Sequence, residues 1–471
     1  MSEPTTQSTP GSTHRIDLLD ELRWRGLLHQ CTDEQALAEH LAEGQKRIYC
    51  GFDPTADSLT IGNLVPIMTL VHVARAGHEP VVVMGGGTGL VGDPSGKSAE
   101  RSLIRREQIE ANVAAQRPIF GGVFAGAGLP EPAILNNLEW LSKISFLDAL
   151  RDVGKHFSVN QMIQRDSVRD RLHGREQGIS FTEFSYMILQ ALDFAHLHLT
   201  RRVTVQCGGS DQWGNIVSGI DLIRRLHVEL PMRRNRPAWL STEAGEAVLR
   251  EELERRASAF GFTMPLVTKA DGGKFGKSES GAVWLTESRT SCYEYSQFWT
   301  NTADADVERF LKIFTLLDRA EIETVMARHQ SEPGRRYAQK MLAKHAATLR
   351  YGETEAIGAI RAAEALFSGD LRTLPLDALE AAIADAPCIE RPRADLASGV
   401  ALLDLVIAAG LASSKREARE FLAAGAVRVN GQQRGQHSVG NELITAADLL
   451  HDSLTVLKRG KKKQAVVRWV D

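Results

Sequence analysis

The stretch VTVQCGGSDQWGN, at residues 203–215, is a short apolar run that ends in a glycine turn and leads into a segment of helical character. Two earlier stretches have the same order, IYCGF at 48–52 and PVVVMGG at 80–86. Repetition of strand, glycine turn and helix is typical of an open parallel α/β sheet. Such sheets bind ligands at the carboxyl ends of their strands, which is where all three glycine turns fall. We therefore predict an α/β fold with a Rossmann-like parallel sheet.

The composition is that of a chain with several folded domains. The 471 residues are 43% hydrophobic and 24% charged, with no run of 18 apolar residues, so we expect no membrane span. The five cysteines are widely spaced and contain no CxxC pair, which argues against structural zinc and a disulfide framework and fits a reducing cytoplasm. Residues 1–15 are polar and lack an apolar core, so we expect a disordered extension rather than a signal peptide.

The charge is uneven along the chain. The net charge is −3, but residues 391–471 carry 13 Lys/Arg against 8 Asp/Glu, which gives +5 there and −8 elsewhere. An acidic body with a basic end favours a polyanionic partner at that end, although a solvated surface has the same composition.

The rest of the chain is mainly helical in pattern. Residues 140–200 and 303–367 are expected to be helical, most clearly FTEFSYMILQALDFAHL at 181–197. The charged stretch 229–258 is interpreted as an insertion, and the Pro-containing, charged stretch 386–399 as a linker. A compact α/β segment is expected from 400 to the end.

Three segments have the residues needed to hold phosphates. PTADSLTIGN at 54–63 follows a strand and opens a helix, whose free N–H groups attract anions. KFGKS at 274–278 is a glycine-rich loop with two lysines, and GDPSGKSAER at 92–101 follows another glycine turn. Each alone is also compatible with plain architecture or solvated charge.

Together these strings resemble the two signatures of the class I aminoacyl-tRNA synthetases. YCGFDPTADSL, GLVGDPSGK, RDVGKHFSVNQM, GISFTEFSY, GGSDQWGN and LVTKADGGKFGKS are, in this order, similar to the bacterial tyrosyl-tRNA synthetases. The resemblance implies a homodimer that uses ATP and Mg²⁺, with the metal carried by the phosphates, to activate L-tyrosine. It then transfers the tyrosyl group to the 3′ end of its tRNA.

The resemblance also implies roles for individual residues. Six surround the substrate tyrosine: Tyr49 and Asp193 at its hydroxyl, Asp93, Tyr186 and Gln190 at its ammonium group, and Gln212 at its carboxylate. Eight contact ATP: Cys50, Gly51, Asp53, Gly62, Asn63, Gly209, Asp211 and Lys277. The catalytic residues at the phosphates are Lys97, Arg101, Lys274 and Lys277, with Thr55 and Thr60. Independently, Tyr186, Gln190 and Asp193 have the spacing of one helix face.

The chain departs from the family signature at Thr60, where histidine is common. Threonine can donate one hydrogen bond, but it is shorter and uncharged, so we expect Thr55 to carry more of that role. No covalent nucleophile is needed, because the substrate carboxylate can attack the α-phosphate directly. We expect no protein metal site.

The C-terminal segment resembles a small RNA-binding domain of this family. SSKREAREFLAAGAVRVNGQ at 413–432 predicts a basic helix, a strand and a hairpin turn at NG. The basic side chains expected to face tRNA are Lys415, Arg416, Arg419, Lys458, Arg459, Lys461, Lys462 and Lys463. The expected domains are 1–15 extension, 16–264 catalytic domain with the 229–258 insertion, 265–385 KFGKS loop and helical region, 386–399 linker, and 400–471 RNA-binding domain.

Three alternatives stay open on the sequence. A tryptophanyl-tRNA synthetase shares the fold, but indole has no hydroxyl for Tyr49 and Asp193. A small-molecule nucleotidyltransferase or ATP-dependent ligase would not need the basic C-terminal domain. A non-catalytic RNA-binding relative is suggested only by Thr60. Amino-acid-dependent pyrophosphate exchange distinguishes the first and the third of these from a tyrosyl-tRNA synthetase.

Overall fold

The computed structural model describes residues 16–93, 104–165, 168–169, 179–232, 237, 240, 251, 253, 258–273, 275–278, 281–368, 371–383, 386–434, 442–460 and 463–471. The chain forms two compact units. The first comprises residues up to 286 together with 303–330, and the second comprises 287–302 together with 331–471. The expected extension at 1–15 and most of the 229–258 insertion lie outside the described residues.

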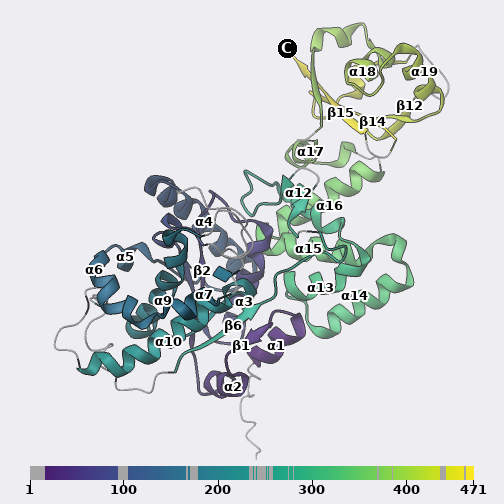
Figure 1. Cartoon of the computed structure of the whole chain (residues 1–471). Coiled ribbons are helices and arrows are strands. Elements are labelled where there is room, and N and C mark those ends of the chain that lie inside the picture. Colours follow the sequence, from purple (N-terminus) through teal and green to yellow (C-terminus); the bar gives the residue numbers. More distant parts are fainter. Residues whose placement is uncertain are drawn as a thin grey trace, which may run out of the picture. The chain divides into compact units, whose positions relative to one another are not determined.

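The first unit is built on a six-stranded sheet in the order β1-β6-β5-β2-β3-β4 (Figure 1). Its strands are β1 (Gln30–Cys31), β2 (Arg47–Phe52), β3 (Glu79–Met84), β4 (Ala133–Asn136), β5 (Val203–Gly209) and β6 (Phe260–Met264). Strands β2 to β6 pair in parallel, and only β1 is antiparallel. The predicted parallel sheet is confirmed. Glycine ends β5 at Gly209 and directly follows β3 at Gly85, whereas Gly51 lies inside β2, which ends at Phe52.

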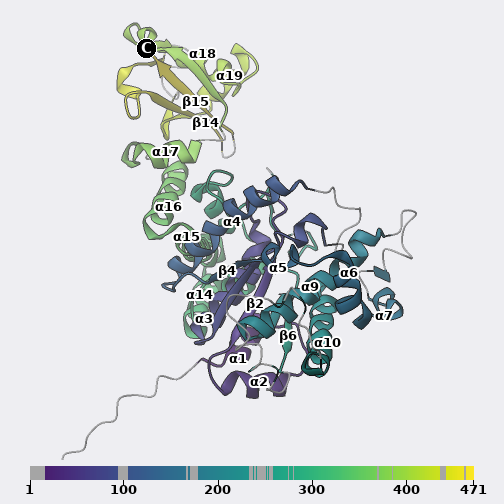
Figure 2. The same cartoon turned by 90° about the vertical axis from the view of Figure 1, so that its left-hand side faces the viewer.

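Helices cover both faces of this sheet (Figure 2). On one face lie α9 (Phe181–Arg201) and α10 (Trp213–Glu229), which share a core with Tyr49, Val81 and Val83. On the other lie α3 (Leu64–Arg75) and α4 (Arg106–Gly126), where Phe120 meets Phe52 edge to face. Alternate residues of β2 therefore face opposite helical layers.

The described residues of the first unit also form shorter helices. They are α1 (Leu18–Arg25), α2 (Glu34–Ala42), α5 (Leu138–Leu141), α6 (Phe146–Asp148) and α7 (Val159–Ile163). The predicted helix at 181–197 is confirmed as α9. It begins at the N-cap Ser180, whose side chain accepts from the Glu183 amide, and ends at Arg202 in the left-handed conformation.

The expected helical region 265–385 is divided between the two units. Helices α13 (Asp304–Phe314) and α14 (Arg319–Ser331) belong to the first unit, except for the last residue of α14. Buried Arg25 of α1 fixes the chain after α13, because it donates to the carbonyls of Lys312, Thr315 and Leu317 at 2.8–3.0 Å. These long-range hydrogen bonds have no signature in local sequence.

The second unit contains the remaining helices and a five-stranded sheet in the order β12-β11-β14-β15-β9. The helices are α12 (Cys292–Thr300), α15 (Tyr337–Tyr351), α16 (Glu353–Ser368), α17 (Leu376–Ile383), α18 (Leu402–Ala408) and α19 (Lys415–Ala423). The sheet strands are β9 (Cys388–Pro392), β11 (Val427–Val429), β12 (Gln432–Arg434), β14 (Leu454–Arg459) and β15 (Lys463–Val470); β10 (Val400–Ala401) and β13 (Leu443–Ile444) pair separately.

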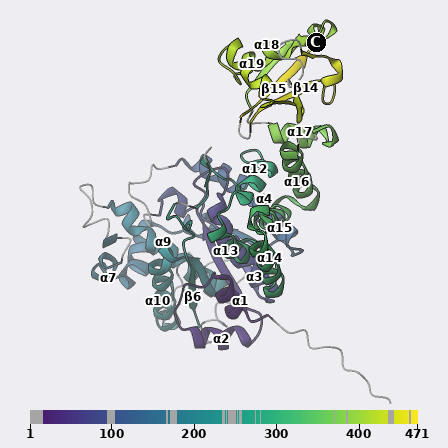
Figure 3. The same cartoon turned by 90° about the vertical axis from the view of Figure 1, so that its right-hand side faces the viewer.

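Helices cover both faces of this second sheet as well (Figures 1 and 3). Apolar side chains of α18 and α19 pack on one face, and those of α16 and α17 pack on the other. The predicted NG hairpin is confirmed, since Asn430 and Gly431 both have positive φ between β11 and β12.

The expected linker at 386–399 is wrong. Residues Cys388–Pro392 form β9, which pairs in parallel with β15 over five positions at the sheet edge. Proline and charge suggested a linker, but an edge strand tolerates both, because its outer backbone groups need no partner in the sheet. The C-terminal α/β fold therefore begins near Cys388 rather than at 400.

Candidate active site

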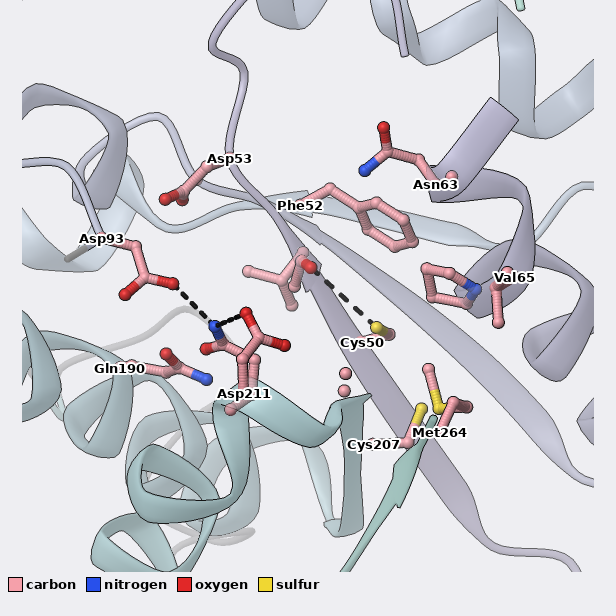
Figure 4. Close-up of a pocket in the computed structure, with 18 of the residues that line it drawn as sticks. Cys50, Phe52, Asp53, Asn63, Val65, Asp93, Gln190, Cys207, Asp211 and Met264 are labelled. Carbon is pink, nitrogen blue, oxygen red and sulfur yellow. Dashed lines mark hydrogen bonds between the residues drawn. The ribbon is translucent and has the colours of Figure 1, made fainter. Parts of the chain in front are cut away.

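A cavity of about 460 Å³ opens at the carboxyl ends of β2 and β5 (Figure 4). These two neighbouring strands are where the chain order reverses, the usual ligand position in an open α/β sheet. Every described residue expected at tyrosine lines this cavity: Tyr49, Asp93, Tyr186, Gln190, Asp193 and Gln212. So do Cys50, Gly51, Asp53, Thr55, Thr60, Gly62, Asn63, Gly209 and Asp211.

The innermost polar groups are Tyr49 and Asp193. The Asp193 carboxylate accepts hydrogen bonds from Asn137 Nδ2 at 2.8 Å and Trp140 Nε1 at 2.7 Å. The Tyr49 hydroxyl is fully buried and has no hydrogen-bond partner among the described residues. An unpaired hydroxyl beside a carboxylate is complementary to a ligand group that both donates and accepts.

Burial controls the ionisation of this pair. Desolvation raises the pKa of Asp193 to about 7, even though the hydrogen bonds from Asn137 and Trp140 act in the opposite direction. Burial, together with the nearby Asp193 charge, raises the pKa of Tyr49 well above its ordinary value. Tyr49 is therefore a neutral phenol at physiological pH.

Polar side chains nearer the mouth are held by one another. Tyr186 Oη donates to Asp53 Oδ2 at 2.9 Å, and Thr88 Oγ1 donates to Asp53 Oδ1 at 2.9 Å. A Cβ at Gly85 would lie 2.1 Å from Asp53 Oδ1, so only glycine leaves room for this carboxylate. Asp53, expected at ATP, thus also positions Tyr186.

A second network joins the residues expected at the ammonium and carboxylate groups. Gln212 Nε2 donates to Asp93 Oδ2 at 2.7 Å, as the dashed line in Figure 4 shows. Asn215 Nδ2 donates to Gln190 Oε1 at 2.9 Å and to Gln212 Oε1 at 3.1 Å. Asn215 therefore orients both glutamine amides, and Gln212 Nε2 also donates to Asp211 Oδ2 at 3.2 Å, so this amide faces the two carboxylates at the cavity.

The TIGN turn is closed by its own side chains. Thr60 Oγ1 donates to Asn63 Oδ1 at 3.0 Å, and the Thr60 amide donates to the same oxygen at 3.0 Å. The Thr60 hydroxyl proton is thus used inside the turn, at the start of the helical segment Ile61–Asn63 that leads into α3. Thr55 is exposed at the cavity, so its hydroxyl is accessible.

The KFGKS loop is joined to TIGN through the backbone. The Val283 amide donates to the Gly276 carbonyl at 3.0 Å, and the Ile61 amide donates to the Val283 carbonyl at 2.9 Å. Gly276 has φ +87, and a Cβ there would lie 3.0 Å from Ile61 Cγ2. Residues 281–285 therefore hold the two signatures in a fixed relation.

The aromatic side chain of the same loop packs on α13. The Phe275 ring stacks on Phe314 at 5.2 Å between centroids and meets Phe310 edge to face at 5.1 Å. Asp306, also on α13, accepts from the Ala270 amide through both oxygens at 3.0–3.1 Å. Ala270 and Phe275 are thus held by a helix from elsewhere in the chain.

Several expected residues lie wholly or partly outside the described part of the chain. These are Lys97, Arg101, Lys274, Lys461 and Lys462; for Lys277 the backbone alone is described, in a short pairing with Ala282.

Four functional neighbours were missed in the sequence: Thr88, Asn137, Trp140 and Asn215. Asn137 and Trp140 follow β4, so an amide at the carboxyl end of a parallel strand was the available signal. Among the described residues, no group of three His, Cys, Asp or Glu side chains is arranged to hold a metal ion. All five cysteines are free. None of the described helices has a long enough apolar stretch to cross a bilayer.

Comparison with known proteins agrees with this geometry. The family "tRNA synthetases class I (W and Y)" matches residues 41–368, and the "Tyrosine--tRNA ligase SYY-like C-terminal domain" matches 379–467. The tyrosine–tRNA ligase of Staphylococcus carnosus is 45% identical over 96% of this chain and 99% of its own. That of Geobacillus kaustophilus is 46% identical over 96% and 100%.

A solved structure shows the same fold. The C-terminally truncated mitochondrial tyrosyl-tRNA synthetase of Aspergillus nidulans superposes with a TM-score of 0.64, at 32% identity, over 75% of this chain and 95% of its own. The protein thus belongs to the class I tRNA synthetases of the tryptophan and tyrosine group. Within that group it is a member of the bacterial tyrosine–tRNA ligase family.

Proposed function

We propose that the chain is a tyrosine–tRNA ligase that forms tyrosyl-adenylate in the cavity described above and passes the tyrosyl group to tRNA. The observation that carries this proposal is the buried Tyr49 hydroxyl near Asp193, which has no hydrogen-bond partner in the described part of the chain. A substrate phenol donates to Asp193 and accepts from Tyr49, so it completes both. Phenylalanine leaves the Tyr49 hydroxyl buried without a partner and brings no donor to Asp193, and an indole has no oxygen to accept from Tyr49.

The other end of the substrate lies among the mutually held polar groups. Asp93, Tyr186 and Gln190 accept from the ammonium group, and the Gln212 amide donates to the carboxylate. Because Asp53 and Asn215 fix these side chains beforehand, little conformational entropy is lost when tyrosine binds.

Adenylate formation needs positioning and charge stabilisation. The tyrosine carboxylate attacks the α-phosphate in line with departing pyrophosphate. Cys50, Gly209 and Asp211 contact the ribose, and the helix start at Gly62 and Asn63 approaches the nucleotide. The cationic clamp consists of Lys97, Arg101, Lys274 and Lys277, with Thr55 as hydroxyl donor. ATP enters as its Mg²⁺ complex, with the metal held by phosphate oxygens.

The second unit supplies the tRNA-binding surface. On α19, Lys415, Arg416 and Arg419 are exposed, as is Lys463 on β15. Arg459 has a different part: it donates to the Leu411 carbonyl at 2.6 Å and lies over the Phe421 ring at 4.3 Å. We assign Arg459 to positioning of α19 and the exposed cations to phosphate contact.

The active form is a homodimer. Six large apolar side chains that are exposed in the single chain fall within residues 146–181: Phe146, Leu147, Leu150, Val159, Ile163 and Phe181. A second copy of the chain would remove them from water. Phe181→Asp should shift the sedimentation coefficient to that of a monomer. Leu376→Asp, at an exposed apolar position of the other unit, should leave the dimer intact; a dimeric Phe181→Asp variant would refute this interface.

Separating the two steps tests the complete proposal. A chain truncated after Ala386 lacks β9 and everything beyond it, so it should retain tyrosine-dependent pyrophosphate exchange and lose tRNA charging. The truncation precedes β9 because that strand belongs to the C-terminal sheet. Normal charging of tRNA by the truncated chain would contradict the assignment.

A further inference from the structure

Two cysteines face each other inside the nucleotide end of the cavity. Cys50 on β2 and Cys207 on β5 are register partners on adjacent parallel strands, so their side chains project from the same face of the sheet. Both line the cavity, with Met264 at the end of β6 beside them (Figure 4). Three sulfur atoms from three neighbouring strands thus form one wall.

The pair is isolated from the other thiols. Cys31, on β1, is separated from Cys207 by Phe262 of β6, which is the register partner of both. Cys292 and Cys388 belong to the second unit. Cys50 and Cys207 are therefore the only two of the five cysteines on directly paired strand positions.

The environment keeps Cys207 as a thiol. A hydrogen bond with Cys50, together with burial, holds the pKa of Cys207 well above its ordinary value. A thiol of this kind reacts slowly with reagents that need a free thiolate. A reagent that bonds both sulfurs should bind more tightly than one that bonds a single sulfur, because the second bond forms between groups already held in the same site.

We propose that Cys50 and Cys207 form a dithiol site for trivalent arsenicals, and that its occupation excludes ATP. An organoarsenic oxide, R–As=O, forms two As–S bonds with the thiols, loses its oxygen, and releases it with the two thiol protons as one water. Arsenic stays trivalent, so no oxidant or reductant is required. Soft sulfur donors favour soft partners of this kind.

The adduct would block one substrate and spare the other. Cys50 is expected at the ribose, so exclusion of ATP rests on the proposed function, whereas formation of the adduct does not. Tyr49 projects from the opposite face of β2, into the core with α9 and α10, and contacts Phe194 there at 5.4 Å between rings. Tyrosine binding should therefore survive the modification.

The experiment treats the full-length protein with phenylarsine oxide. We expect the intact mass to show one arsenic per chain, and tyrosine-dependent pyrophosphate exchange to be lost. Tyrosine should still bind in equilibrium dialysis. ATP added beforehand should prevent formation of the adduct. A dithiol such as 2,3-dimercaptopropanol should restore activity, while the monothiol 2-mercaptoethanol at the same thiol concentration should not.

Matched variants locate the site. Cys207→Val and Cys207→Ser should each lose the arsenic adduct, with every exchange rate taken relative to the same variant untreated. Cys292→Ser, at a buried cysteine of the other unit, should be modified like the unaltered chain. An adduct that persists in both Cys207 variants would overturn the dithiol site. An adduct that forms at Cys207 without blocking exchange would overturn only the position of ATP.

Discussion

Replacing Tyr49 with phenylalanine should weaken tyrosine activation and stabilise the free protein. In the free chain the Tyr49 hydroxyl is buried, with no partner among the described residues. A buried, unsatisfied hydroxyl costs about 1–3 kcal/mol, so its removal should raise the free energy of unfolding of this unit by that amount. Effects of opposite sign on stability and on activity are expected where a buried polar group is left unsatisfied for its ligand.

The loss of activity can be bounded in the same way. One neutral hydrogen bond to the substrate hydroxyl is worth about 0.5–1.5 kcal/mol, which corresponds to a fall in kcat/KM for tyrosine of about 2- to 13-fold. Phenylalanine has no hydroxyl and never forms this hydrogen bond. The ratio of kcat/KM for tyrosine to kcat/KM for phenylalanine should therefore fall as well.

Scanning calorimetry and pyrophosphate exchange measure the two effects. Tyr351→Phe is the control, because its partly buried hydroxyl is satisfied: it donates to the Thr290 carbonyl at 2.9 Å. That variant should destabilise its own unit by about 1 kcal/mol and leave tyrosine activation unchanged. The reasoning is refuted if Tyr49→Phe destabilises its unit, or if its kcat/KM for tyrosine equals that of the unaltered protein.

Three further predictions concern other parts of the site. Burial raises the Asp193 pKa from 3.8 to about 7, so between these pH values the folded state binds a proton that the unfolded state does not. The free energy of unfolding should therefore fall as pH rises through this range. In urea unfolding, Asp193→Asn should flatten this pH dependence. Thr60→Ala should reduce steady-state pyrophosphate exchange less than Thr55→Ala, because the Thr60 hydroxyl proton is donated to Asn63, and the reverse order would contradict this role. Phe275→Leu should lower kcat for adenylate formation while the KM for tyrosine is unchanged, since the ring packs on α13; an unchanged kcat would show that this contact does not position the loop.

Local pattern predicted the parts of the structure that depend on local physics. The glycine-ended strands and the polar face of α9 follow from side-chain periodicity, and the turn at Asn430 follows from the backbone conformation that a tight hairpin requires. These elements carry much of the cavity wall. Helical spacing placed Tyr186, Gln190 and Asp193 on one face, but their assignment to tyrosine, like that of Tyr49, came from the family resemblance.

The errors lie where distant segments decide the structure. Residues 388–392 form a strand only because β15 lies beside them, whereas their proline and charged residues had indicated a linker. Asn137 and Trp140 hold Asp193 across more than fifty residues of sequence, and Arg25 reaches carbonyls nearly three hundred residues away. Such contacts depend on tertiary packing and leave no periodic trace in the sequence.

The central claim is that the pair Tyr49 and Asp193 selects the amino acid. Pyrophosphate exchange with each of the twenty amino acids, on the purified full-length protein, tests it most directly. The account predicts exchange with tyrosine far above that with phenylalanine or tryptophan. Exchange driven equally well by tryptophan, or no exchange with tyrosine, would contradict it.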